Sequence, residues 1–159
     1  MSPVGTSAKA ESPAQPEARG AWMRFTVGEE ELAVPVAVIQ EVASGKQLQE
    51  EAGAPPGLLG IVESQGRKVP VLDLAGHLEI PISGEGESYV LIVRVASRWL
   101  GLRVTSVLGL VVLALEDMRP LPQSARSGPT GEFLGAYPWE DRWLLLLDVD
   151  QFFSAAVGP

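Results

Sequence analysis

Three side chains of this sequence have the types that acid–base catalysis uses. They are His77, the single histidine, and two aspartates that end apolar runs, Asp73 in "PVLDL" and Asp148 in "LLLLD". A histidine works as a general base when a nucleophile or an orienting acid lies beside it, and two carboxylates can share a proton, as in an aspartic protease. No repeated Asp-Thr-Gly loop accompanies the aspartates, and a carboxylate that accepts backbone N–H bonds in a terminal turn explains each of them. We therefore predict no catalytic residue and a surface position for His77. A small β-barrel hydrolase that uses Asp73 or Asp148 is the alternative.

Residues that hold metals and cofactors are scarce. The sequence has no cysteine and one histidine, so neither a disulfide nor a thiolate metal site can form, and a zinc site would have to consist of carboxylates. No Gly-Lys-Ser/Thr loop that cradles a phosphate occurs. We predict neither a cofactor nor a metal.

The charge of the chain restricts its partners. The net charge is −8, from 20 acidic and 12 basic side chains, which argues against nucleic acid and against anionic membrane surfaces. The longest apolar runs, such as Leu108–Leu115, span about one strand, whereas a membrane helix needs ~20 residues. Residues 1–20 contain no apolar signal-peptide core. We expect a cytoplasmic protein without direct membrane insertion.

The apolar runs are short and are punctuated by 17 glycines and 13 prolines, a pattern typical of β structure. Residues 100–104 alternate apolar side chains with Gly101 and Arg103, as a half-buried strand does. About nine or ten strands with little helix favour closed antiparallel barrels, so the predicted class is mainly β. The remaining expectations are a disordered tail at 1–20, a turn or two of helix at 46–52, a loop at 75–88 and a short C-terminal helix at Asp148–Ala156.

Five blocks of the sequence resemble, in order and spacing, a CheW-like domain. The resemblance implies two intertwined, five-stranded SH3-like barrels that share a hydrophobic core, over residues 21–156. It also implies a non-enzymatic scaffold that couples chemoreceptors to the histidine kinase CheA. The blocks are "FTVGEEELAVPVAVIQEV" (25–42), "PPGLLGIVESQGRKVPVLDL" (55–74), "LGLRVTSVLGL" (100–110), "RPLP" (119–122) and "FLGAYPWEDRWLLLLDVDQFF" (133–153).

The resemblance also implies which positions meet each partner. The expected partners are the regulatory domain of a CheA-type kinase and the cytoplasmic tip of a chemoreceptor. The kinase-facing positions are Ile39, Glu41, Gly60, Gln65, Gly66, Gly101 and Gly135. The receptor-facing positions, in a groove between the barrels, are Tyr89, Val107 and Leu110.

The sequence departs from the family pattern at charged positions. Gln65 replaces the usual arginine, which resembles a partner for the Glu41 carboxylate, and Thr105 replaces a common aspartate. An arginine–carboxylate pair is bidentate and charge-assisted, whereas Gln65 offers Glu41 a neutral donor. Glu63 makes this end more negative, although Arg67 and Lys68 follow closely. Two alternatives follow: an adaptor matched to a kinase with compensating changes, or a receptor-binding spacer that does not recruit the kinase.

Overall fold

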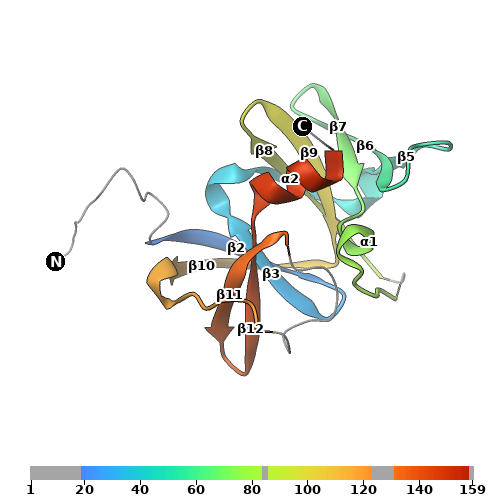
Figure 1. The fold of residues 1–159 in the computed structure, drawn as a ribbon. Helices are drawn as coiled ribbons and strands as arrows, with labels where there is room; N and C mark the ends of the chain where they lie inside the picture. The colour runs from blue at the N-terminus through green and yellow to red at the C-terminus, as the bar shows by residue number, and fades with distance from the viewer. Residues whose placement is uncertain (1–18, 84–85, 123–130, 158–159) are drawn as a thin grey trace.

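The computed structural model describes residues 19–83, 86–122 and 131–157 (Figure 1). Residues 1–18 of the tail predicted at 1–20 lie outside the described residues. Arg19 and Gly20 do not belong to a tail, because strand β2 (Arg19–Val27) already begins there and pairs with β10 (Ser106–Ala114). The described residues fold into two β-sheets with two short α-helices.

The first sheet forms a barrel, called barrel one, from strands near both ends of the chain. Its strand order is β10-β2-β3-β12-β11, and all neighbours are antiparallel except β3 and β12, which are parallel. A bridge between Arg119 and Ala136 closes it, because each backbone N–H donates to the other residue's carbonyl, at 2.7 and 2.9 Å. The strands not yet defined are β3 (Glu30–Pro35), β11 (Phe133–Trp139) and β12 (Arg142–Leu147).

The second sheet, called barrel two, is inserted in the chain between β3 and β10. Its order is β4-β8-β9-β7-β6-β5, in which β5 is a two-residue strand added at the edge. A side-chain hydrogen bond from Ser64 on β6 to Glu41 on β4 joins the two sides of this sheet, so it curls into a barrel. Its strands are β4 (Ile39–Ser44), β5 (Gln49–Glu50), β6 (Leu58–Ser64), β7 (Arg67–Leu72), β8 (Tyr89–Val95) and β9 (Arg98–Val104).

Three apolar clusters fill this arrangement. Each barrel has its own interior, and a larger cluster lies between the barrels, where alternate residues of a strand face the two sides. On β8, for example, Val90 and Ile92 pack inside barrel two, whereas Leu91 and Val93 belong to the shared cluster. The prediction of two barrels on a shared core is therefore confirmed.

The helices match the prediction in part. Helix α2 (Val149–Val157) confirms the C-terminal helix, and its Phe152 and Phe153 are buried in the shared cluster. Helix α1 (Leu74–Leu78) occupies the start of the predicted loop. The helix predicted at 46–52 was wrong, because a 3₁₀ turn at Gly45–Gln47 leads directly into β5. Two further 3₁₀ turns lie at Val36–Val38 and Leu115–Asp117.

Candidate functional site

The carboxylates considered for catalysis serve as helix caps. Asp73 accepts the backbone N–H of Gly76 at 3.2 Å at the start of α1, and Asp148 accepts that of Gln151 at 3.2 Å at the start of α2. The structural role predicted for both is confirmed. The two caps belong to different helices, and neither carboxylate contacts His77 through its side chain in the described structure.

His77 lies at the rim of the molecule, as expected. Its Nε2 is 3.4 Å from Glu132 Oε2, and its ring packs edge-on against Phe152 at 4.8 Å between ring centroids. This packing anchors α2 on the shared cluster. Among the described residues, no group of three or more His, Cys, Asp or Glu is placed to hold a metal ion.

The carboxylate of Glu41 is bound by a different residue from the one expected. The hydroxyl of Ser64, which is 3% exposed, donates to Glu41 Oε1. Gln65 instead forms the β6–β7 turn with Gly66, at φ 53° and 78°, and its side chain is exposed. The expected Gln65–Glu41 contact was therefore wrong, since the two-residue turn leaves Ser64 as the last inward-facing side chain of β6. We call Ile39, Glu41, Ser64, Gln65 and Gly66 the Glu41 corner.

The three other predicted kinase-facing positions are buried glycines that face the chain itself. A Cβ on Gly60 would collide with the carbonyl of Gln49 on β5, and one on Gly101 would lie 2.8 Å from the Val90 side chain. A Cβ on Gly135 would lie 2.6 Å from the Arg119 carbonyl, at the closure of barrel one. These glycines let neighbouring strands approach closely. Gly60 and Gly101 lie in barrel two with the Glu41 corner, and Gly135 lies in barrel one.

An apolar stripe covers the outer side of the edge strand β10. Leu108, Leu110 and Val112 are 43%, 62% and 67% exposed, and their even spacing places them on one face of the strand. Leu110 was predicted as receptor-facing, whereas Leu108 and Val112 were not singled out, because the continuous apolar sequence "LGLVV" at 108–112 does not show which side chains face outward. We call these three residues the β10 stripe.

The other two predicted receptor-facing residues lie at the junction of the barrels. Val107 is half-buried against the shared cluster, next to the β10 stripe. Tyr89 is also half-buried and stands opposite Val104, and its hydroxyl donates to Glu87 at 3.3 Å. The structure thus places Val107 and Leu110 together on β10, and Tyr89 on the neighbouring barrel.

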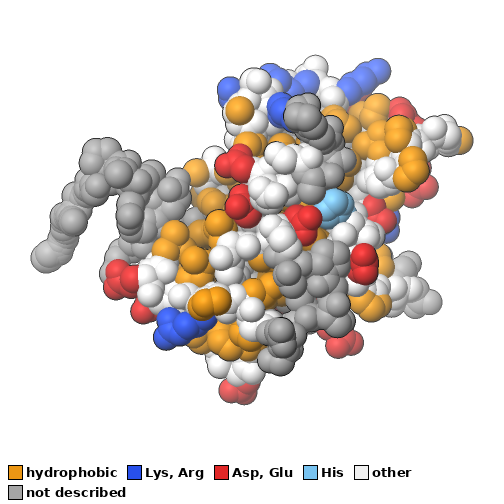
Figure 2. All heavy atoms as spheres, viewed as in Figure 1, with side chains coloured by type: hydrophobic (Ala, Val, Ile, Leu, Met, Phe, Trp, Pro, Cys, Tyr) orange, Lys and Arg blue, Asp and Glu red, His pale blue; other side chains and the backbone are white. Residues whose placement is uncertain are grey.

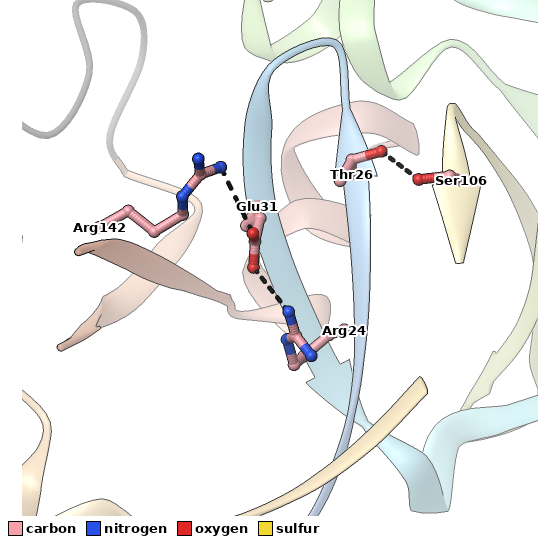
Figure 3. A network of polar contacts seen from close by, with 5 residues as sticks. All are labelled: Arg24, Thr26, Glu31, Ser106 and Arg142. Carbon is pink, nitrogen blue, oxygen red and sulfur yellow. Dashed lines mark hydrogen bonds and ion pairs between the residues drawn. The ribbon is translucent and has the colours of Figure 1, made fainter. Parts of the chain in front are cut away.

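Polar contacts on barrel one hold β10 and its neighbours in register (Figure 3). The Thr26 and Ser106 hydroxyls are 2.6 Å apart across β2 and β10. On the adjacent strands, Glu31 accepts from Arg24 at 3.2 Å and from Arg142 at 3.4 Å. The Arg24 guanidinium also lies over the Trp139 ring, at 5.0 Å. Strand β10, which carries the exposed stripe, is therefore held by its backbone pairing with β2 and by the Thr26–Ser106 hydrogen bond.

A cleft of about 390 Å³ lies between the turn after β2 and the segment that follows α1. Thr105 lines it, and its hydroxyl accepts the backbone N–H of Gly28 at 2.9 Å, which ties β9 to the β2–β3 turn. Thr105, where the resemblance implied an aspartate, therefore makes a structural contact here. Arg103 and Asp73 line the same cleft.

The sequence model of the family described as "CheW-like domain" matches residues 21–157, nearly all of the described structure. The chain belongs to the CheW family. Among curated proteins it is similar to a chemotaxis protein CheW of Klebsiella aerogenes, with 27% identity over 139 residues that cover 84% of this chain and 81% of that protein. A chemotaxis protein CheW of Rhizobium meliloti is 26% identical over 132 residues, which cover 82% of this chain and 85% of its own.

Solved structures agree on the fold. The crystal structure of the scaffolding protein TtCheW from Thermoanaerobacter tengcongensis superposes with a TM-score of 0.75 at 20% identity, covering 88% of this chain and 95% of that one. The resemblance predicted from five sequence blocks is confirmed. As a CheW-family member, the chain is a chemotaxis adaptor or scaffold. No helix among the described residues has the length and apolar character needed to cross a membrane.

Proposed function

We propose that this CheW-family protein couples chemoreceptors to a CheA-type histidine kinase by binding each of them on a separate surface, without catalysing a reaction. The kinase's regulatory domain binds at the Glu41 corner. The cytoplasmic tip of a receptor binds along the β10 stripe, with Val107 and Tyr89 at its inner end. The protein works in the cytoplasm and joins receptor arrays through these partners.

The observation that carries the proposal is the β10 stripe. Three large aliphatic side chains on one face of an edge strand expose apolar area that a barrel does not need for its own core. Such contiguous apolar surface marks protein-binding sites more often than isolated exposed residues do. The neighbouring strand and the polar contacts below it hold the stripe rigid, which lowers the entropic cost of binding.

The Glu41 corner supports the kinase half of the proposal. Glu41 is half-buried and already bonded to Ser64, so its carboxylate is held in one place at the surface of barrel two. Gln65 and Gly66 stand exposed beside it in the turn. Gly60 and Gly101 support the corner indirectly, because they allow the strands of barrel two to pack close together.

A second candidate is a receptor-binding spacer that does not recruit the kinase. Gln65 favours this candidate, because the Glu41 carboxylate is bonded to Ser64 and the corner lacks the arginine fork that the family resemblance implies.

One binding experiment separates the two candidates. The full-length protein is titrated, in separate calorimetric runs, with the CheA regulatory domain and with a receptor cytoplasmic fragment from the same organism. Binding to both supports the coupling adaptor, and binding to the receptor alone supports the spacer. Binding to neither contradicts both.

A further inference from the structure

Four basic side chains stand together at one end of barrel two. Arg67 and Lys68 open β7 directly after the Gln65–Gly66 turn, Arg94 lies near the end of β8, and Arg98 opens β9. Strands β7 and β9 are parallel neighbours, so the β6–β7 and β8–β9 turns lie side by side at the same end. Figure 1 shows both turns at the top of the molecule, and Figure 2 shows Lys and Arg side chains gathered there. We call Arg67, Lys68, Arg94 and Arg98 the basic cap.

The basic cap is unusual for a chain of this composition. With 20 acidic and 12 basic side chains, the chain places a third of its positive charge on two adjacent turns. All four side chains are exposed. Two carboxylates accompany the four cations, because Glu63 stands opposite Lys68 and Glu41 is bonded to Ser64 just before the turn. The cap is therefore a local positive surface on an acidic protein.

Contacts hold Arg67 and Arg94 of the cap in place. The Arg67 guanidinium lies over the Trp99 ring at 4.1 Å, and Trp99 is itself half-buried against the interior of barrel two. Arg94 donates from Nε to the Ala96 carbonyl at 3.1 Å. An arginine stacked on an aromatic ring keeps the N–H groups at its edge available for a carboxylate, and such ordered arginines are frequent binding hot spots.

We infer that the basic cap docks an acidic patch on the kinase's regulatory domain, directly beside the Glu41 corner. The inference rests on the proposed function, because it adds a charge requirement to the same kinase-facing end. The cap supplies from Arg67 and its neighbours the positive charge that Gln65 does not provide. A protein partner fits better than a lipid or nucleic-acid surface, because the net charge of −8 repels an extended polyanion, whereas four charges can match a local acidic patch.

The test measures binding of the full-length protein to the CheA regulatory domain at two salt concentrations, roughly 0.05 and 0.5 M. Lys68→Glu reverses one charge of the cap. Its matched control is Lys46→Glu, the same change on an exposed lysine beyond the far end of β4. Arg67→Glu is measured in the same way, and Arg67→Lys keeps the charge without the planar fork. Circular dichroism and thermal unfolding confirm that each variant folds.

We expect Lys68→Glu and Arg67→Glu each to weaken kinase binding by about tenfold at low salt, with smaller losses at high salt, and mainly through a slower association rate. Lys46→Glu leaves the affinity within about twofold of the parent. Equal losses for Lys68→Glu and Lys46→Glu, or parent affinity that does not change with salt, would overturn the cap inference while leaving the adaptor function in place.

Two further outcomes complete the test. A parent protein that binds the receptor but no kinase domain at either salt concentration overturns the coupling function, and the cap inference with it. Parent protein that sediments with phosphatidylglycerol vesicles, with Lys68→Glu abolishing that binding, would assign the cap to a lipid surface and overturn the inference of a protein partner.

Discussion

The hydroxyl of Ser64 on β6 donates a hydrogen bond to the carboxylate of Glu41 on β4. Strands β4 and β6 are separated by three strands in the sheet order, so this bond joins two sides of barrel two that share no backbone ladder. Ser64 is the single buried polar residue among those described. The bond therefore both closes the barrel and fixes the carboxylate of the proposed kinase-binding surface.

Replacing Ser64 with alanine removes the donor and leaves the Glu41 carboxylate without it. We expect Ser64→Ala to lower the free energy of unfolding by about 1–3 kcal/mol, the usual cost of losing a buried hydrogen bond to a charged group. Urea denaturation measures the change. Ser97→Ala, an exposed serine in the β8–β9 turn, is the control and should change stability by less than about 0.5 kcal/mol. Equal stabilities for the two variants would show that the Ser64–Glu41 bond does not stabilise the barrel.

Gln65 occupies the position at which the family resemblance implies an arginine, and its side chain is exposed in the turn. We expect Gln65→Arg to strengthen binding to a CheA regulatory domain by about two- to fivefold, the effect of one added surface ion pair. Gln65→Lys adds the same charge without the planar fork and should give a smaller gain. Calorimetric titration measures all three proteins. Unchanged affinity for Gln65→Arg would count against a kinase contact at this turn.

The β10 stripe offers a test of the receptor-binding surface. We expect Leu110→Glu to reduce affinity for a receptor cytoplasmic fragment at least about tenfold, because a charge replaces an apolar contact at the interface. Its stability should change little, since Leu110 is 62% exposed. The matched control is Leu134→Glu on β11, where the side chain is 44% exposed and lies outside the stripe. Equal receptor affinity for the two variants would remove the receptor from the β10 stripe.

Two glycines of barrel two should respond differently to alanine. In Gly60→Ala the new Cβ meets the backbone of β5, 2.8 Å from the Glu50 Cα, so the edge strand must shift. In Gly66→Ala there is open space, but φ of +78° strains any L-residue, at about 1 kcal/mol. We expect Gly60→Ala to destabilise the fold more, and to increase amide hydrogen exchange at Gln49 and Glu50. Exchange in β5 that stays at the parent rate would contradict the proposed clash.

Local patterns in the sequence predicted much of the architecture. The alternation at 100–104 lies within β9, and Asp148 was correctly interpreted as a carboxylate that accepts a backbone N–H bond in a turn. Tertiary contacts decided what the patterns missed. Residues 46–52 have helix-forming side chains, but the exposed ladder of β6 offers Gln49 and Glu50 backbone partners, so they form a strand.

Predicting the hydrogen-bond partner of Glu41 required the position of the β6–β7 turn, which the sequence indicates only weakly. Turn residues with positive φ are usually Asn-Gly or Asp-Gly, and Gln65-Gly66 is a less recognisable version of that signal. Once the turn is placed there, period-two alternation directs Val62 and Ser64 inward and Gln65 outward. The basic cap required the strand order as well, because its two turns, at residues 65–66 and 96–97, are far apart along the chain and meet through the parallel pairing of β7 with β9.

The insertion of barrel two between β3 and β10 has a consequence for how the protein is made. Every described strand of barrel two comes from residues 39–104, so all of them emerge from the ribosome before β10 does. Barrel one at that moment has two of its five strands, and β3 still awaits β12, with Leu32 paired to Leu145 in the finished protein. Closing so long a loop is slow, and domains fold as their residues emerge. Barrel two, which carries the basic cap, can therefore fold before barrel one is complete. Strand β10, which carries the exposed stripe, is then added next to a barrel two that has already folded.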